Sequence, residues 1–201
     1  MVELLVPKIY TPKGLVKENI LSGKKVLDLG CGTKKLPGSI GVDVKKHPSV
    51  DVVHDLNKSP WPFKNSSFDM ILAQHIAEHV DDFISFISEI HRIAKNNAHI
   101  IIQAPYFRSV NAFADPTHKR FFATHSLDYF LKKDIVLSTY NYTNFKFRQV
   151  GFWIEWPTKR RSFFGKLFNK FIHRHPDFYD QYLSILCPAN TLTWELICEK
   201  P

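Results

Sequence analysis

The chain has few cysteines and no long apolar run. Its 201 residues include three cysteines, at positions 31, 187 and 198, without C-x-x-C spacing. This pattern argues against a disulfide framework and predicts reduced thiols in a cytoplasmic protein. No apolar run approaches the roughly 20 residues that cross a bilayer. The first residues, Met1-Val2-Glu3-Leu4-Leu5, lack the basic start of a signal peptide.

Internal repeats and low-complexity linkers are also absent, so the sequence predicts a single domain over residues 1–201. The hydrophobic fraction of 44% and the charged fraction of 23% are typical of globular proteins. The net charge of +8 could suit nucleic acid, an anionic membrane or an acidic small substrate. Many of the basic residues form lysine pairs, which are scattered along the chain at positions 24–25, 34–35, 45–46 and 132–133. We therefore favour a solvated basic surface.

Apolar periodicity predicts an α/β fold. Strands are expected over residues 25–29, 40–44, 49–54, 67–73, 98–103, 145–156 and 191–199. Helices are expected over 80–94, 126–133 with Ser126 as N-cap, 163–172, and a short stretch before Ser22. This alternation predicts a doubly wound, Rossmann-like, seven-stranded and mostly parallel sheet with an antiparallel late strand. In such sheets the ligand lies at the carboxyl ends of the strands.

The most informative stretch is the apolar run 26–29, which leads into Gly30-Cys31-Gly32. A buried strand that ends in a glycine turn presents backbone N–H groups to a ligand, and a Cβ would block both the tight turn and the close approach. A dinucleotide site would need a third glycine where Lys35 stands, followed by a crossover helix. The short stretch between Gly32 and Ile40 cannot form a regular crossover helix, so a dinucleotide is disfavoured.

Four motifs resemble those of class I S-adenosylmethionine-dependent methyltransferases, in the order in which that family has them. They are Leu27-Asp28-Leu29-Gly30-Cys31-Gly32-Thr33, Ile40-Gly41-Val42-Asp43, Val53-His54-Asp55-Leu56 and the segment from Phe68 to Val80. The resemblance covers about residues 22–135. It implies a cofactor half over about 22–104, and an acceptor part over about 105–200 that holds a long loop, helices and late strands.

The resemblance also implies S-adenosylmethionine as cofactor and assigns its contacts. Asp43 would bind the ribose hydroxyls, Asp55 the adenine amino group, and Leu56 would form an apolar wall. The complete expected set is Asp28, Gly30, Cys31, Gly32, Asp43, Val44, Asp55, Leu56 and Gln74. The competing interpretation is that Asp43 and Asp55 are ordinary turn acids.

The exit from the glycine turn departs from the family, which often has a third glycine at the place of Lys34 and a helix after it. The sequence therefore leaves two alternatives for the residues near the methionine carboxylate. Either Lys34 or Lys35 pairs with that carboxylate, or both face solvent.

Three histidines are candidates for catalysis, since a hydroxyl nucleophile benefits from a base that titrates near neutral pH. They are His75, His79 and His118. Our hypothesis is that His118 is the base, that Asp115 orients it and that Arg120 binds an anionic acceptor. Tyr106, with Phe107 and Tyr129, is expected to line the acceptor pocket. The alternatives are an ordinary turn at Asp115 and aromatic residues that belong to the core.

Residues 75–79 also spell H-x-x-E-H, a zinc hydrolase signature in which histidines at i and i+4 share a helical face. The segment follows a predicted parallel strand at the place that the methyltransferase pattern occupies. A five-residue match is also common by chance. No metal is therefore expected.

The sequence thus predicts methyl transfer to a small-molecule acceptor, at oxygen. Two alternatives stay open: an RNA or protein methyltransferase, suggested by the charge, and a non-catalytic binding protein on the same fold. The RNA or protein alternative is disfavoured, because no Asn/Asp-Pro-Pro-aromatic run of the kind that amino-group methyltransferases carry follows the fourth strand. Residues 159–175 could form a core helix, a lid or a peripheral contact with an anionic membrane. The oligomeric state is left open.

Overall fold

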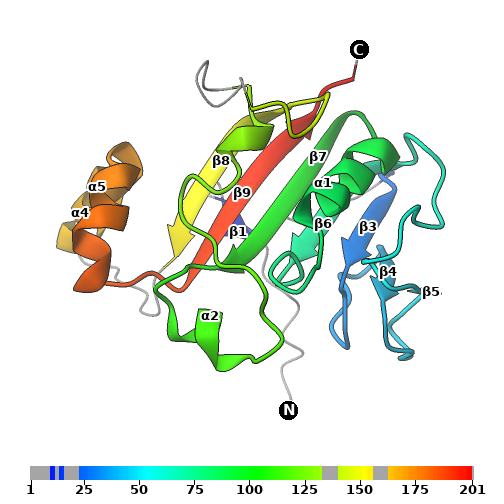
Figure 1. The fold of residues 1–201 in the computed structure, drawn as a ribbon, viewed down its shortest axis with the longest axis horizontal. Helices are drawn as coiled ribbons and strands as arrows, with labels where there is room; N and C mark the ends of the chain where they lie inside the picture. The colour runs from blue at the N-terminus through cyan, green and yellow to red at the C-terminus, as the bar shows by residue number, and fades with distance from the viewer. Residues whose placement is uncertain (1–9, 12–13, 16–22, 133–139, 156–162, 201) are drawn as a thin grey trace.

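A seven-stranded sheet forms the centre of the molecule (Figure 1). The computed structural model describes residues 10–11, 14–15, 23–132, 140–155 and 163–200. The sheet contains β3 (Val26–Leu29), β4 (Ile40–Asp43), β5 (Val52–Val53), β6 (Phe68–Gln74), β7 (Ala94–Pro105), β8 (Phe147–Glu155) and β9 (Thr191–Cys198). Their order is β5-β4-β3-β6-β7-β9-β8.

Strand β9 is antiparallel to both of its neighbours, whereas the pairs from β5 to β7 are parallel. The predicted mostly parallel sheet with an antiparallel late strand is therefore confirmed. The chain leaves β3 toward β4 on one side and later returns to β6 on the other. This reversal of strand order at β3 is the place where α/β sheets bind ligands.

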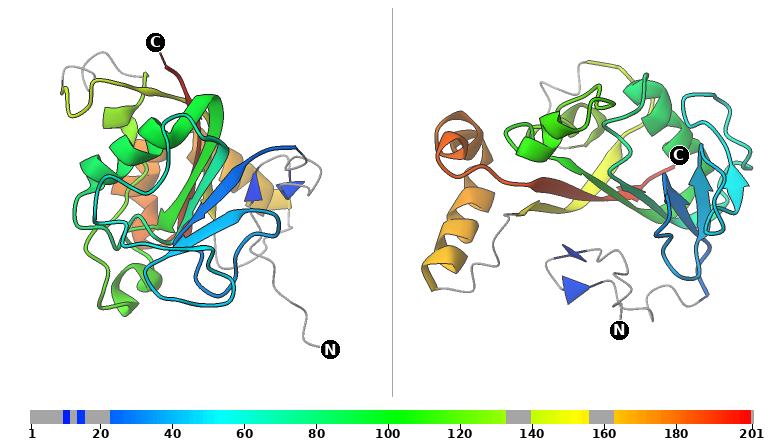
Figure 2. Two further views of the ribbon diagram at one scale, coloured as in Figure 1. Left: turned by 90° about the vertical axis from the view of Figure 1, so that its right-hand side faces the viewer. Right: turned by 90° about the horizontal axis from the view of Figure 1, so that it is seen from below.

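Helix α1 (Phe83–Ile93) covers one face of the sheet and buries its apolar side in the main core. The five apolar residues expected on its inner face are all buried: Phe83, Phe86, Ile87, Ile90 and Ile93. The helix begins later than predicted because Asp82 caps it, accepting hydrogen bonds from the N–H groups of Ile84 and Ser85. Figure 2 shows α1 and α2 (Val110–Ala114) on one side of the sheet. The hairpin of β1 (Tyr10–Thr11) and β2 (Gly14–Leu15) lies on the other.

The connections from β3 through β4 and β5 to β6 contain no helix. The predicted absence of a crossover helix between Gly32 and Ile40 is thus confirmed. The expected strand 49–54 is reduced to two residues. Val50 donates its N–H to the His47 carbonyl in a turn, and the chain first bonds to β4 at Asp51, whose N–H donates to the Gly41 carbonyl. The expected strand 98–103 is longer than predicted and starts at Ala94, with Asn97 at a φ of +63° within it.

The helix predicted over 126–133 is wrong. Only the 3₁₀ turn η2 (Asp128–Phe130) forms there, and the structure describes this segment up to residue 132. The Ser126 hydroxyl accepts a hydrogen bond from the N–H of Ala123, so it closes the preceding turn instead of capping a helix. The short helix expected before Ser22 lies outside the described residues.

Beyond the β8 edge lie α4 (Phe163–Arg174), α5 (Pro176–Gln181) and η3 (Leu183–Ile185), drawn in orange in Figure 1. Ile172 and Tyr179 are fully buried and join these helices to the main core. The helix predicted over 163–172 is confirmed. None of the described helices is long and apolar enough to cross a membrane.

Candidate functional site

The glycine turn lies at the carboxyl end of β3, where the strand order reverses. Gly30 and Gly32 adopt φ angles of +64° and +51°. A Cβ on Gly30 would lie 2.8 Å from Ile76 Cγ1, so this position has no room for a side chain. A Cβ on Gly32 would meet no atom within 4 Å. The backbone at Gly32 therefore faces open space that a ligand can fill.

Asp43 at the end of β4 holds this turn. Its Oδ2 accepts a hydrogen bond from the Gly32 N–H at 2.9 Å, and its Oδ1 accepts one from the Lys45 N–H at 2.9 Å. A carboxylate offers about four acceptor positions, so two stay available for the hydroxyls of a ribose. The neighbouring Val44 is 59% exposed and provides apolar surface beside these acceptors.

Asp28 lies beneath the turn and is buried. Its Oδ2 accepts a hydrogen bond from the Leu36 N–H at 2.8 Å, which fixes the short connection after the turn. Burial raises the pKa of the Asp28 carboxyl to about 6, against the opposing effects of the Leu36 N–H and the Lys35 charge. Burial and the nearby Asp28 also raise the pKa of the Cys31 thiol to about 11, so that thiol stays protonated at neutral pH.

Lys35 is committed to another partner. Its ammonium lies 2.6 Å from Asp51 Oδ2, which also accepts the Gly41 N–H at 2.7 Å. These two bonds lower the pKa of Asp51. In the structure Lys35 therefore pairs with Asp51 and not with a position open to the methionine carboxylate. Lys34 is exposed to solvent.

The remaining expected cofactor residues also lie along the carboxyl edge of the sheet. Asp55 follows β5 and accepts the Asn57 N–H at 3.1 Å, which forms a turn. Leu56 is buried, and its carbonyl accepts a hydrogen bond from the Trp61 indole. Gln74 ends β6, and its amide donates to Gln103 Oε1 at 3.4 Å.

Residues 75–79 form an irregular turn after β6, so His75 and His79 do not share a helical face as the hydrolase pattern requires. His75 has a φ of +52°, a conformation that costs a residue with a side chain of the order of 1–3 kcal/mol. Glu78 in this turn is only 1% exposed, yet neither carboxylate oxygen has a hydrogen-bond partner among the residues that the structure describes. Sequence reasoning gave this residue no role beyond its place in the motif.

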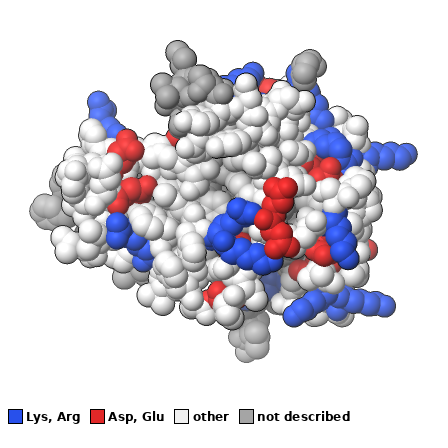
Figure 3. Space-filling model, viewed as in Figure 1, with Lys and Arg blue, Asp and Glu red and all other residues white. Residues whose placement is uncertain are grey.

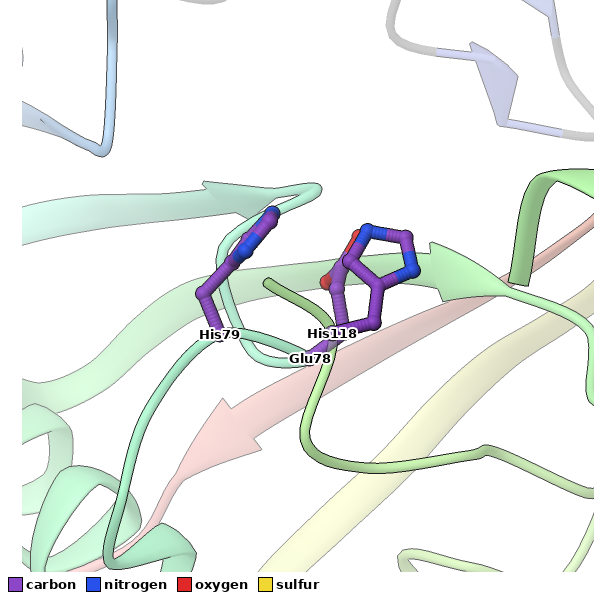
Figure 4. A group of neighbouring side chains, drawn as sticks. All are labelled: Glu78, His79 and His118. Carbon is purple, nitrogen blue, oxygen red and sulfur yellow. The ribbon is translucent and has the colours of Figure 1, made fainter. Parts of the chain in front are cut away.

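His118 from the loop after α2 lies beside that turn (Figure 4). Its Nδ1 is 2.9 Å from the Ala112 carbonyl oxygen, and its Nε2 is 3.9 Å from Glu78 Oε1. The rings of His79 and His118 meet edge to face, with centroids 4.7 Å apart. Two segments that are distant in sequence thus bring Glu78, His79 and His118 together, while the half-exposed His75 has its Nδ1 3.4 Å from Glu78 Oε1.

The acceptor residues predicted from sequence are placed differently. Asp115 accepts hydrogen bonds from the backbone N–H and the hydroxyl of Thr117, and the carboxylate that faces the His118 ring is Glu78. The idea that Asp115 orients His118 is therefore wrong. Arg120 donates to the backbone carbonyls of Val80 and Asp81, so much of its hydrogen-bonding capacity is used within the chain.

Tyr106 does not line a pocket. The side chain is fully buried and its hydroxyl donates to Asp180 Oδ1 at 2.8 Å, linking β7 to α5. Burial raises the pKa of this phenol well above its usual value. The core alternative is therefore correct for Tyr106. Phe107 and Tyr129 are partly buried residues that pack against the core, and Tyr129 also lines a cavity together with Arg120.

The model of a methyltransferase domain matches residues 11–136. Solved structures share the fold at low sequence identity. An S-adenosylmethionine-dependent methyltransferase from Archaeoglobus fulgidus is 20% identical with a TM-score of 0.57, and the match covers 87% of this chain and 86% of that one. A second such enzyme, from Mesorhizobium loti, is 13% identical with a TM-score of 0.52, covering 87% and 91%.

The [4+2]-cyclase SpnF is also similar, at 14% identity and a TM-score of 0.54, covering 89% of this chain and 76% of that one. No curated protein matches the chain. The comparisons therefore define the family and the fold, while the acceptor has to be argued from the site.

Proposed function

The chain belongs to the class I methyltransferases that use S-adenosylmethionine, and on this premise we propose that it methylates a hydroxyl group of a small molecule. The observation that supports this proposal is the buried Glu78 carboxylate beside the His118 imidazole, in the turn after β6 whose Ile76 lies against Gly30. Methyl transfer needs little from a protein beyond alignment of the nucleophile, exclusion of water and removal of a proton.

The cofactor half has the features that binding requires. Bound S-adenosylmethionine supplies an electrophilic methyl group. Gly32 offers its open backbone face, and Asp43 keeps acceptor positions for the ribose. The exposed Val44 offers apolar surface to an adenine ring, and the largely buried Leu56, next to Asp55, would contribute only an edge of that wall. These residues bind and orient, and none of them is placed to exchange a proton with an acceptor.

The acceptor side has the groups that could take up a proton. We assign this role to the imidazoles of His118, His75 and His79 around Glu78. Next to His118, the exposed side chains of Phe113 and Phe121 stack with ring centroids 4.6 Å apart. An acceptor with an apolar or aromatic part would cover these two rings while its hydroxyl faces the histidines.

Replacement of His118 tests the proposal. His118→Ala should lower turnover by about 10²–10⁴-fold, since that is the usual contribution of a positioned acid–base group. Cofactor affinity, measured by calorimetry, should stay within about twofold, because His118 contacts none of the cofactor residues. His99→Ala is the matched control, since His99 also faces a glutamate, Glu195, at 3.2 Å but lies away from this site. Unchanged turnover in His118→Ala would refute the assignment.

The acceptor class is tested with methyl-labelled cofactor and cell extract separated into small molecules, RNA and protein. We expect label in the small-molecule fraction. The RNA alternative lacks a continuous basic surface on the face drawn in Figure 3, where acidic and basic side chains alternate. Label in RNA or protein would overturn the small-molecule proposal, and absence of cofactor binding at millimolar concentration would favour a non-catalytic protein.

A further inference from the structure

Glu78 presents an energetic problem that the described residues do not solve. Both of its oxygens are buried and lack hydrogen-bond partners. The nearest cationic candidates, His75 Nδ1 at 3.4 Å and His118 Nε2 at 3.9 Å, are not in hydrogen-bond geometry with it. A buried carboxylate without compensation is strongly disfavoured, and proteins solve this by pairing it, by coordinating a metal or by neutralising it with a proton.

The hydrogen bonds of the two adjacent histidines indicate which solution applies. A carbonyl oxygen only accepts, so the contact with Ala112 places the proton of His118 on Nδ1. The Thr117 hydroxyl donates to Asp115 Oδ1 at 2.6 Å, and therefore accepts from His79 Nδ1 at 2.9 Å. Both imidazoles thus hold their proton on Nδ1 and leave the Nε2 lone pair free.

This arrangement is the one that metal-binding histidines have. A ligating imidazole donates its other N–H to a carbonyl, a carboxylate or a similar group, which fixes the tautomer and the orientation of the ring. Here the Ala112 carbonyl serves His118, and the Thr117–Asp115 pair serves His79. The role of Asp115 is then to support a ligand, which explains a carboxylate that has no contact with the His118 ring.

We propose that Glu78, His79 and His118 form a binding site for a divalent transition-metal ion, with Zn²⁺ as the best match. One candidate ligand atom from each residue lies within 4.8 Å of the others. Atoms bound to one tetrahedral Zn²⁺ at about 2.1 Å lie about 3.4 Å apart, so the side chains need to move by little more than about 1 Å. Two imidazoles and one carboxylate suit zinc and leave a fourth position open.

The ion would join the turn after β6 to the loop after α2, and its open position would face the acceptor. There it could polarise a hydroxyl as a Lewis acid, and His118 would then act as a ligand in place of a free base. This consequence rests on the proposed function, whereas metal binding itself does not. Metal binding is therefore measured without cofactor or acceptor, so its failure does not count against methyl transfer.

The test is equilibrium dialysis of the chelator-treated full-length chain against Zn²⁺, with metal analysis. We expect one high-affinity Zn²⁺ per chain and at least about tenfold weaker binding in Glu78→Gln, His79→Ala and His118→Ala. The conservative change Thr117→Val, which removes the support of His79, should weaken binding by about 10–100-fold. His99→Ala should bind as the wild type does.

Co²⁺ provides a second readout, since a tetrahedral site gives intense visible absorption that these substitutions should remove. Circular dichroism of each variant checks that it is folded. If Glu78→Gln does not fold, Thr117→Val decides the matter, because this exposed residue is not part of the core. Absence of Zn²⁺ binding at micromolar concentration, or equal binding by Thr117→Val and the wild type, would overturn the proposal.

Discussion

The two halves of the site treat their acidic side chains in opposite ways. On the cofactor side, Asp28, Asp43 and Asp51 accept backbone N–H groups, at distances of 2.7–2.9 Å. On the acceptor side, Glu78 is more deeply buried than any of these and accepts no hydrogen bond. The cofactor half is thus complete before its ligand arrives. The acceptor side of the site, where Glu78 lies against His118, holds a carboxylate whose partner, in our proposal, is a metal ion.

The comparison also covers apolar surface. On the cofactor side, Leu27, Leu29 and Val42 are fully buried in the sheet, while Val44 and Val53 at the strand ends are 59% and 53% exposed. Around the acceptor side, Val110, Phe113 and Phe121 are exposed by 82%, 65% and 49%. Such a concentration of exposed apolar side chains beside a functional cluster is typical of a surface that another molecule covers. If the acceptor binds here, as we propose, it would bury these three side chains.

If the cofactor half is preorganised, the largest effect should follow from disturbing the glycine turn. Gly30→Ala places a Cβ 2.8 Å from Ile76 at a φ of +64°, so we expect a loss of unfolding free energy of about 2–5 kcal/mol, the sum of backbone and packing costs. Chemical denaturation measures this. Gly23→Ala is the matched control, since Gly23 also has a positive φ of +74° but no atom within 4 Å of the added Cβ.

The control should lose only about 1–2 kcal/mol, the backbone cost alone. Cofactor affinity should fall further in Gly30→Ala than in the control, because the turn against Ile76 is displaced. Equal losses in the two variants would mean that the turn is not tightly packed, and that the cofactor half is less organised than we infer.

Asp28 gives a pH-dependent test of the same half. Its folded-state pKa of about 6 lies above the ordinary value of 3.8, so its contribution to stability is full below about pH 4 and is lost as pH rises through about 6. Two pKa units correspond to about 3 kcal/mol. Asp28→Asn should therefore gain stability relative to the wild type by about this amount between about pH 4 and about pH 7.

The measurement is the unfolding free energy of both proteins across that range. The asparagine oxygen can still accept the Leu36 N–H, so the fold of the connection is kept. All other titrating groups are shared by the two proteins and cancel in the difference. If the difference in unfolding free energy between Asp28→Asn and the wild type does not change with pH, the pKa of Asp28 is not raised by folding.

The smallest effect is expected at the rim of the cofactor half. Lys35→Met removes the ion pair with Asp51 but keeps an apolar stem, and the pair is partly exposed. We expect a loss of about 0.2–1 kcal/mol that shrinks at high salt, and cofactor affinity within about threefold. Lys34→Met, at an exposed position, is the control. A much larger loss of cofactor affinity in Lys35→Met would indicate that Lys35 binds the methionine carboxylate directly.

The mostly parallel sheet, its antiparallel late strand and most elements follow from the sequence, because apolar periodicity and glycine positions act locally. The strand order β5-β4-β3-β6-β7-β9-β8 was found only in the structure. The failure at 126–133 has a physical cause. Ser126 turns its hydroxyl back to Ala123, and η2 ends after three residues because Leu131 and Lys132 extend toward Phe147. This contact with a distant strand decides that a turn forms here instead of a helix. Local helix propensity does not contain that information.

By itself, the sequence determined the family, the cofactor and the glycine turn. Gly30, Asp43 and Asp55 could be predicted as site residues because each follows the end of a strand. Parallel strands bring these ends together at one edge of the sheet. The tertiary structure decided the partners. Tyr106 is buried in the core, and His118 lies against Glu78, which is forty residues away in the chain. That meeting depends on how the loop after α2 packs against the turn after β6, and no spacing within either segment encodes it.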